Sequence, residues 1–259
     1  IALKMLAEGN GDACISAGST GALLTGATLI VKRVKGIRRA AMGPVMPNKA
    51  GGKTVILDCG ANAECTPEFL LQFGLVGSLY AKKYLGVENP KVGLLNNGAE
   101  ETKGTPLQKE AFALLTAAAQ QGLINFVGNV EARDVLNGVC DVLVCDGFSG
   151  NILLKTCEGT VAVLMGNLKQ IFTKNLLTKL CYLILKPGLK LFKAKLDYNE
   201  HGGAPLMGVT KPVIKAHGSS KATAFKNAIF QAVKFAEGKA IDKITEISFL
   251  TILSKHSRL

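Results

Sequence analysis

The strongest constraint on the fold is a pattern that recurs through the first 150 residues. A short apolar segment is followed by a turn of small and polar residues, and then by a helical pattern. The expected strands cover residues 13–16, 54–58, 92–96 and 142–146, with a further candidate at 124–128. Apolar strands that alternate with helices indicate a mainly parallel sheet covered by helices on both faces.

The expected helices cover residues 21–32, 67–85, 106–119 and 151–173. Pro67 and Pro106 suit first-turn positions, and Thr66 and Thr105 precede them as candidate caps. Further along, residues 201–208 resemble a glycine-containing loop. A final strand is expected within residues 213–220, followed by a helix over 222–238.

The composition changes after about residue 164. Residues 165–196 are rich in leucine and lysine, and we interpret them as a helical hairpin that turns at Pro187 and Gly188. We therefore divide the chain into an α/β core (1–164), a basic amphipathic hairpin (165–200), and a return to the core with a C-terminal helix (201–259).

Apolar residues three or four apart predict an apolar stripe along this hairpin. The stripe comprises Leu168, Ile171, Phe172, Leu176, Leu180 and Leu183. With lysines around it, the hairpin suits an anionic membrane surface. The residues expected to touch the membrane are Leu176, Leu180, Leu183, Ile184, Lys186 and Lys190. The alternative is that the stripe packs against a dimer partner.

The formal net charge of +12 favours acidic partners: nucleic acid, an anionic membrane, an acidic protein or phosphate. Tryptophan is absent and aromatic residues make up only 6% of the chain, which argues against a nucleic-acid platform.

No apolar segment approaches the roughly 20 residues of a spanning helix. The chain opens as if within an amphipathic helix, so we expect an N-terminal portion to precede it.

Seven cysteines occur without a CxxC pair, and we expect them to be reduced and mostly buried in a cytoplasmic protein. The three histidines include His201 and His256, and none pairs with cysteine at ligand spacing. A zinc site is therefore not expected.

Ligands of open parallel sheets bind beyond the carboxyl ends of the strands. There, Gly18, Ser19, Thr20 and Gly21 offer backbone N–H groups and hydroxyls at a helix start, which suits phosphate. The alternative is an ordinary strand-to-helix turn. Neither GxGxxG nor GxxxxGK[ST] is present, so a dinucleotide site and a P-loop lack their fingerprints.

Candidate catalytic or binding residues follow three further predicted strands. Lys103, in the polar loop 96–104, could stabilise phosphate or a developing oxyanion, or could simply be solvated. Asp146 could orient or deprotonate a substrate, or could cap a helix. His217 could contact phosphate or cap a turn. No Ser-His-Asp or Cys-His pattern stands out, so nothing in the sequence indicates a covalent nucleophile.

Eight stretches together resemble the PlsX family of phosphate acyltransferases over nearly the whole chain. They cover residues 15–23, 57–62, 70–73, 92–104, 126–131, 144–151, 202–204 and 214–219. The chain departs from the family pattern in two ways. The family's N-terminal glycine-rich segment is absent, and Ser19 and Asn97 stand where we expect asparagine and an apolar residue.

The resemblance implies a three-layer α/β fold like that of isopropylmalate dehydrogenases and phosphate acetyltransferases, a homodimer, and no metal or organic cofactor. It implies transfer of an acyl group from acyl carrier protein to inorganic phosphate, with Lys103 and Asp146 as catalytic residues. The basic hairpin favours a long-chain product and a peripheral membrane enzyme. The residues it implies for phosphate and substrate binding are Gly18, Ser19, Thr20, Gly21, Asp58, Asn62, Asn96, Asn97, Glu100, Ser149, Asn151 and His217.

Other functions stay open at this point. A phosphate acetyltransferase that uses coenzyme A is the nearest alternative. A dehydrogenase is disfavoured because the dinucleotide fingerprint and a metal-binding carboxylate cluster are missing. A noncatalytic scaffold at the membrane surface would need only the basic hairpin.

Overall fold

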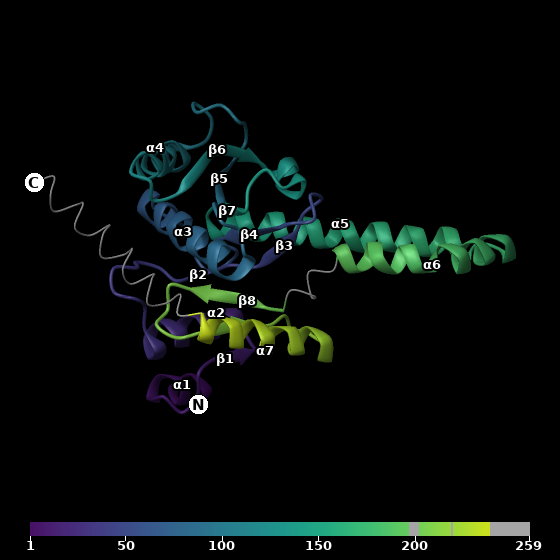
Figure 1. Cartoon of the computed structure of the whole chain (residues 1–259), viewed down its shortest axis with the longest axis horizontal. Helices are drawn as coiled ribbons and strands as arrows, with labels where there is room; N and C mark the ends of the chain where they lie inside the picture. Colours follow the sequence, from purple (N-terminus) through teal and green to yellow (C-terminus); the bar gives the residue numbers. More distant parts are fainter. Residues whose placement is uncertain (197–201, 219, 239–259) are drawn as a thin grey trace, which may run out of the picture.

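The computed structural model describes residues 1–196, 202–218 and 220–238 (Figure 1). His201, Ser219, the end of the predicted hairpin (197–200) and the segment 239–259 with His256 lie outside the described residues. The described chain forms two sheets with helices on both faces, and a long helical arm extends from them (Figure 1).

The first sheet contains most of the strands predicted from apolar segments. Its order is β3 (Val45–Pro47), β4 (Lys53–Leu57), β7 (Val142–Val144), β5 (Lys91–Asn96) and β6 (Asn125–Glu131). From β4 to β6 neighbouring strands are parallel, and β3 is antiparallel to β4. Because the central strands are buried on both faces, they read as continuous apolar segments in the sequence.

Helices cover both faces of this sheet. On one face lie α3 (Pro67–Tyr80), its continuation η2 (Ala81–Leu85) and α4 (Pro106–Gln120); on the other lie η3 (Ala132–Asn137) and the start of α5 (Gly147–Thr173). Thr105 caps α4 in a capping box with Gln108, as predicted. Thr66 is the N-cap residue of α3, as predicted, but its hydroxyl donates to Glu68 (2.7 Å) and makes no side-chain cap bond.

The second sheet has the order β1 (Cys14–Ser16), β9 (Val213–Lys215), β8 (Ala204–Met207), β2 (Ala41–Met42). On one face pack α1 (Ala2–Glu8), α2 (Thr20–Gly26) and η1 (Ala27–Val31), and on the other α7 (Ala222–Glu237). The prediction of a loop over 201–208 is wrong for β8. Its glycines and Pro205 look like a loop in the sequence, but Leu206 and Met207 are buried between β9 and β2.

A short segment, residues 41–47, joins the two sheets. It belongs to the second sheet as β2 and to the first as β3. Between them the Cys59 N–H donates to the carbonyl of Met42 (3.0 Å), and the Ile56 N–H donates to that of Pro44 (3.0 Å). The carboxyl ends of β4 and β7 are thereby fixed beside the second sheet.

The arm consists of the outer part of α5 and of α6 (Leu176–Leu196), which lie side by side (Figure 1). The predicted turn at Pro187–Gly188 is wrong, because the chain reverses at residues 174–175 and Pro187 lies inside α6. The turn forms where it does because the Asn175 Oδ1 accepts from the Thr178 N–H (2.9 Å) and the Asn175 N–H donates to Thr178 Oγ1 (3.1 Å). This pair caps the first turn of α6.

The new position of the turn also divides the predicted apolar stripe between two helices. Leu168 and Phe172 on α5 are half-buried, whereas Leu176, Leu180 and Leu183 on α6 are exposed. Helix α5 passes through residue 164 without a break. Within the described residues, no helix is both long and apolar enough to span a bilayer.

Candidate functional site

A cleft of about 460 Å³ lies between the two sheets. Thr20 at the start of α2, and Lys215 and His217 at the end of β9, contribute one wall. The opposite wall is formed by α5, including Asn151 and Lys155. This is the edge where the carboxyl ends of β1, β9 and β7 meet, as expected for ligand sites in open parallel sheets.

Apolar residues also line the cleft. Met42 and Val45 come from the segment that joins the sheets, and Leu154 comes from α5. The cleft therefore offers both polar and apolar side chains to a ligand. Its size matches that of sites for small organic ligands rather than for an isolated ion.

Three predicted binding residues meet in this cleft: Thr20, Asn151 and His217. Gly18, Ser19 and Gly21 lie beside Thr20 at the start of α2, but outside the cleft lining. The Ser19 Oγ caps α2 by accepting from the Ala22 N–H (3.5 Å). This turn is thus capped by its own side chain, and one of its residues also faces the cleft.

Asp146 caps α5. Its Oδ1 accepts from the Ser149 N–H (2.8 Å) and its Oδ2 from the Ser149 Oγ (2.8 Å), and the residue is 9% exposed. The capping role considered for Asp146 is therefore confirmed, and Ser149 is its partner. The cap fixes the start of α5. Asn151 and Lys155, four residues apart in the next two turns, reach the same cleft.

Asp58 and Asn62 organise the backbone next to the cleft. The wholly buried Asp58 carboxylate accepts from the N–H groups of Met42 (2.8 Å), Cys59 (2.6 Å), Ala61 (3.1 Å) and Asn62 (2.5 Å), and from the Asn62 amide (3.0 Å). Burial raises the pKa of Asp58 despite these hydrogen bonds, which favour the charged form. Neither residue lines the cleft: both hold the backbone beside it, and their contact with substrate stays a prediction.

The loop 96–104 is shaped by amide side chains. Asn96 accepts from the Asn97 N–H (2.8 Å) and donates to the carbonyl of Lys103 (3.2 Å), while Asn129 donates to the carbonyl of Glu100 (2.8 Å). Lys103, Asn97 and Glu100 are exposed and are not part of the cleft lining. The structure does not bring them together with Thr20 and Asn151.

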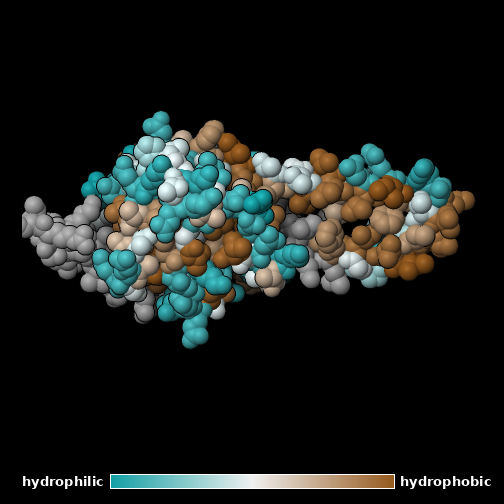
Figure 2. All heavy atoms as spheres, turned by 90° about the horizontal axis from the view of Figure 1, so that it is seen from above, coloured by the Kyte–Doolittle hydropathy of each residue, from teal (hydrophilic) through white to brown (hydrophobic). Residues whose placement is uncertain are grey.

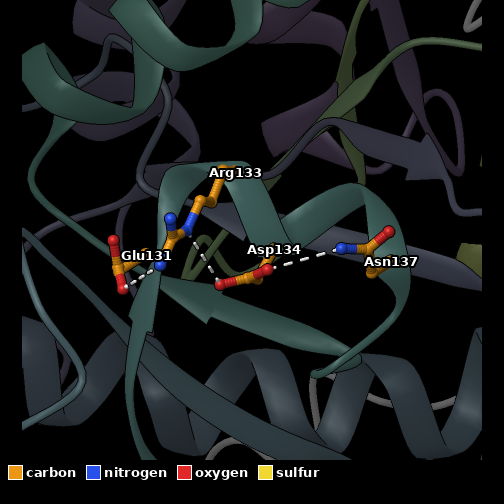
Figure 3. Close-up of polar contacts among 4 residues, drawn as sticks. All are labelled: Glu131, Arg133, Asp134 and Asn137. Atoms are coloured by element: carbon orange, nitrogen blue, oxygen red, sulfur yellow. Dashed lines mark hydrogen bonds and ion pairs between the residues drawn. The ribbon is translucent and has the colours of Figure 1, made fainter.

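The end of β6 carries a surface cluster instead of a site (Figure 3). Arg133 pairs with Glu131 (3.0 Å) and more loosely with Asp134 (3.7 Å), whose carboxylate also accepts from Asn137 (3.4 Å). The Arg133 side chain is 77% exposed, so these ion pairs contribute little stability. Glu131 ends β6, and the other three residues belong to the short helix η3 that follows it.

Three functional candidates were missed by sequence reasoning: Lys155, Glu158 and Lys215. Lys155 Nζ pairs with Glu158 Oε2 at 2.7 Å, and Lys215 is only 9% exposed. Burial lowers the pKa of Lys215, and the positive charge of Lys155 lowers it further. Their spacing could have indicated them: Lys155 is one helical turn after Asn151, and Lys215 is two strand positions before His217.

The cysteines of the α/β core are poorly suited to nucleophilic attack. All seven are free, and burial raises the pKa of Cys59, Cys65 and Cys140 to about 12. These thiols stay protonated near neutral pH, while the thiolate is the reactive form. Cys181 is exposed and is an exception to the expected burial. Among the described residues no cluster of three or more His, Cys, Asp or Glu side chains could hold a metal ion.

Comparison with known proteins gives consistent matches. A family model described as "Fatty acid synthesis protein" matches residues 1–243. A phosphate acyltransferase from Alkaliphilus oremlandii is 53% identical over 246 residues, which cover 95% of this chain and 72% of the relative. One from Brevibacillus brevis is 54% identical over 237 residues, covering 92% of this chain and 70% of the relative.

Solved structures support the fold. A phosphotransacetylase from Streptococcus pyogenes aligns with a TM-score of 0.61 at 20% identity, covering 93% of this chain and 66% of that one. A phosphotransacetylase from Staphylococcus aureus aligns with a TM-score of 0.59 at 17% identity, covering 90% of this chain and 65% of that one. The chain thus spans just under two thirds of these two structures. The predicted phosphate acetyltransferase-like α/β fold is confirmed.

Proposed function

Because the chain belongs to the fatty acid synthesis protein family, whose relatives compared above are named phosphate acyltransferase, we propose that it transfers a long-chain acyl group from acyl carrier protein to inorganic phosphate. Family membership assigns the chain to the acyltransferases; the long-chain donor and its carrier are the proposed part. The observation that carries the proposal is the cleft, which places donors for an anion at Thr20, Asn151 and His217 together with apolar side chains.

In the proposed reaction, a phosphate oxygen attacks the thioester carbonyl directly. A carbon–oxygen bond forms, the carbon–sulfur bond breaks, and the carrier thiol leaves with a proton. Holding both reactants in line in one cleft removes much of the entropic barrier. The protonated state of the buried thiols supports direct attack over an acyl-cysteine intermediate.

Lys103 and Asp146 are proposed to have different roles: Lys103 stabilises charge, and Asp146 positions other residues. Asp146 acts through its cap, which positions Asn151 and Lys155 at the cleft. Lys103 stabilises phosphate or the tetrahedral oxyanion, which requires the exposed loop 96–104 to close over the cleft. Asn96 and Asn97 shape this loop.

The test of the reaction uses the purified protein, acyl carrier protein charged with palmitate, and inorganic phosphate. We expect a hydroxylamine-sensitive acyl-phosphate whose formation depends on both substrates. A parallel reaction with acetyl-coenzyme A in place of the charged carrier distinguishes the proposed reaction from that of a phosphate acetyltransferase. Product from acetyl-coenzyme A alone would favour a phosphate acetyltransferase, and no acyl-phosphate from either donor would overturn the proposal.

We also propose that the positive surface attracts the acidic carrier. The chain carries a formal net charge of +12, and opposite charges accelerate encounter. Screening acts over about 8 Å at physiological ionic strength, so the KM for the carrier should rise with salt. A KM for the carrier that does not change with salt would contradict the proposal that the positive charge attracts the carrier.

The arm is proposed to dock on anionic membrane. Its exposed apolar residues include Leu176 (85%), Ile184 (74%), Leu183 (61%) and Leu180 (57%), and Lys186 and Lys190 are exposed beside them. Figure 2 shows hydrophobic atoms gathered along the arm. Anionic lipid contributes about 1 kcal/mol per nearby lysine, and partial burial of the leucines adds to this. The enzyme would thus act as a peripheral membrane protein on the cytoplasmic side.

A homodimer, which the family resemblance implies, is the last part of the proposal. Helix α7 exposes Ile229 (47%) and Phe230 (56%), which offer an apolar contact surface outside the arm. Sedimentation velocity should show a dimer that Ile229→Glu with Phe230→Glu converts to a monomer. A wild-type monomer would remove the dimer from the proposal.

A further inference from the structure

Lys215 is a buried cation at the end of β9. It is 9% exposed, it lines the cleft, and its ammonium donates to the neighbouring carbonyl of Ala216. No carboxylate of the described residues pairs with it. A buried ammonium group without a counter-charge is unfavourable, so its place in the cleft calls for an anion.

The other charges of the cleft sharpen this point. Lys155 already has a partner in Glu158 at 2.7 Å. Besides His217, the described lining therefore holds two lysines and one carboxylate, whose charges sum to +1. Lys155 and Lys215 line the same cleft, and the positive charge of Lys155 adds to burial in lowering the pKa of Lys215. One bound anion would compensate the cation that Glu158 leaves unpaired.

The neighbours of Lys215 suit a small oxyanion. The Ala216 N–H donates to the carbonyl of Ser16 (2.9 Å), which holds the end of β9 beside the end of β1. The hydroxyl of Thr20 and the imidazole of His217 line the same cleft. An ammonium with hydroxyl and imidazole groups nearby can donate to several oxygens of one phosphate.

We propose that Lys215 binds the inorganic phosphate that accepts the acyl group. The assignment rests on the proposed function and specifies where its acceptor sits. The phosphopantetheine phosphate of the carrier is a different source of the same chemistry. We choose free phosphate because Lys215 is buried at a strand end inside the cleft, whereas the carrier's phosphate lies a full pantetheine arm away from the reacting thioester.

The first test compares Lys215→Gln with Lys211→Gln. Lys211 lies just before β9 on the same segment, and its ammonium also donates to a backbone carbonyl, that of Leu6 (2.7 Å), but it does not line the cleft. Both variants lose one charge. Loss of a charged hydrogen-bond donor should raise the KM for phosphate about 10- to 100-fold in Lys215→Gln only. The KM for the acyl donor should stay within about twofold in both variants.

Phosphate binding is also measured by calorimetry without any acyl donor. We expect Lys215→Gln to lose affinity and Lys211→Gln to keep it. Unchanged phosphate affinity in a folded Lys215→Gln protein overturns the inference, as does a rise confined to the KM of the acyl donor. If the wild-type protein binds phosphate through Lys215 but forms no acyl-phosphate, the proposed function fails and the phosphate site stands.

A second measurement uses the wild-type protein and does not depend on a variant that folds. Amines are acetylated with dilute acetic anhydride in the presence and absence of phosphate, and the products are mapped by mass spectrometry. Phosphate should slow the acetylation of Lys215 and leave that of Lys211 unchanged, with chloride at equal ionic strength as the control. Equal rates at Lys215 with and without phosphate overturn the inference.

Discussion

The two ends of helix α5 lie in opposite environments. At its start, a Cβ added to Gly150 would lie 2.0 Å from the carbonyl oxygen of Asp58, and one added to Gly147 would lie 2.6 Å from that of Asn62. Further along, Gly159 and Gly166 have no neighbours within 4 Å of such a Cβ. Where α5 lines the cleft, neighbours fix its position. In the arm, its sequence is free of such constraints, so the exposed apolar residues there are not required by the packing of the sheets.

The largest difference should come from the glycines. Gly150→Ala forces a methyl group into the backbone of Asp58 and should cost about 3 kcal/mol or more of the free energy of unfolding. Gly166→Ala meets nothing and should stabilise the helix by up to about 1 kcal/mol. Urea unfolding of both variants measures the contrast. Similar midpoints would contradict the difference between the two ends of α5.

A lysine pair tests the same contrast in activity. Lys103→Ala should lower kcat/KM about 100- to 1000-fold, because one stabilising charge is lost from the transition state. Lys179→Ala, in the arm, should leave turnover in detergent unchanged. Since both lysines are exposed, neither change should alter stability by more than about 0.5 kcal/mol. Wild-type turnover by Lys103→Ala would remove this residue from the mechanism.

Helix caps provide a matched pair with smaller effects on stability. Asp146→Ala and Asn175→Ala each remove a side-chain cap, and each should cost about 1–2 kcal/mol locally. Asp146→Ala should also reduce acyl-phosphate synthesis, since Asn151 and Lys155 depend on the first turn of α5. Asn175→Ala should only speed hydrogen exchange within the arm. If both variants lose activity equally, the arm and the cleft are coupled more tightly than the contacts indicate.

A small effect on stability is also expected for Leu183→Glu with Ile184→Glu. Both side chains are exposed, so the free energy of unfolding should change by less than about 0.5 kcal/mol per site. Co-sedimentation with anionic vesicles should nevertheless be lost, while synthesis in detergent continues. The control is Ile229→Glu with Phe230→Glu on α7, which should still sediment with vesicles. If the arm variant becomes monomeric or still binds vesicles, the proposal that the arm docks on the membrane is wrong.

Sequence reasoning was most reliable where structure is encoded locally. The strands around Ile56 and Leu143 were predicted because burial on both faces leaves a continuous apolar segment. The arm's turn was misplaced because Pro187 and Gly188 are strong local breakers, whereas the actual turn depends on the reciprocal bonds of Asn175 and Thr178. A proline in an exposed helix loses one hydrogen bond but does not by itself reverse the chain.

The site was less predictable because it is assembled from two sheets. Thr20, Asn151 and His217 were selected as strand-end or helix-start residues, and the cleft brings these three together. Asp58 has the same local pattern, yet its carboxylate faces inward and is used by backbone N–H groups. The way in which residues 41–47 join the two sheets decides which strand-end residues face a ligand. No local sequence pattern predicts this arrangement.

The length of α5 sets the distance between the cleft and the end of the arm. Eighteen residues separate Lys155 at the cleft from Thr173 at the end of the helix, about 27 Å at 1.5 Å per residue. In the proposed membrane-docked state, the end of the arm would rest on a bilayer and this uninterrupted helix would hold the cleft at a fixed distance above it. The proposed acidic carrier would then reach the cleft from the side without displacing lipid. The proposed acyl-phosphate product would cross the remaining distance along the apolar surface of the arm or bound to the enzyme that consumes it.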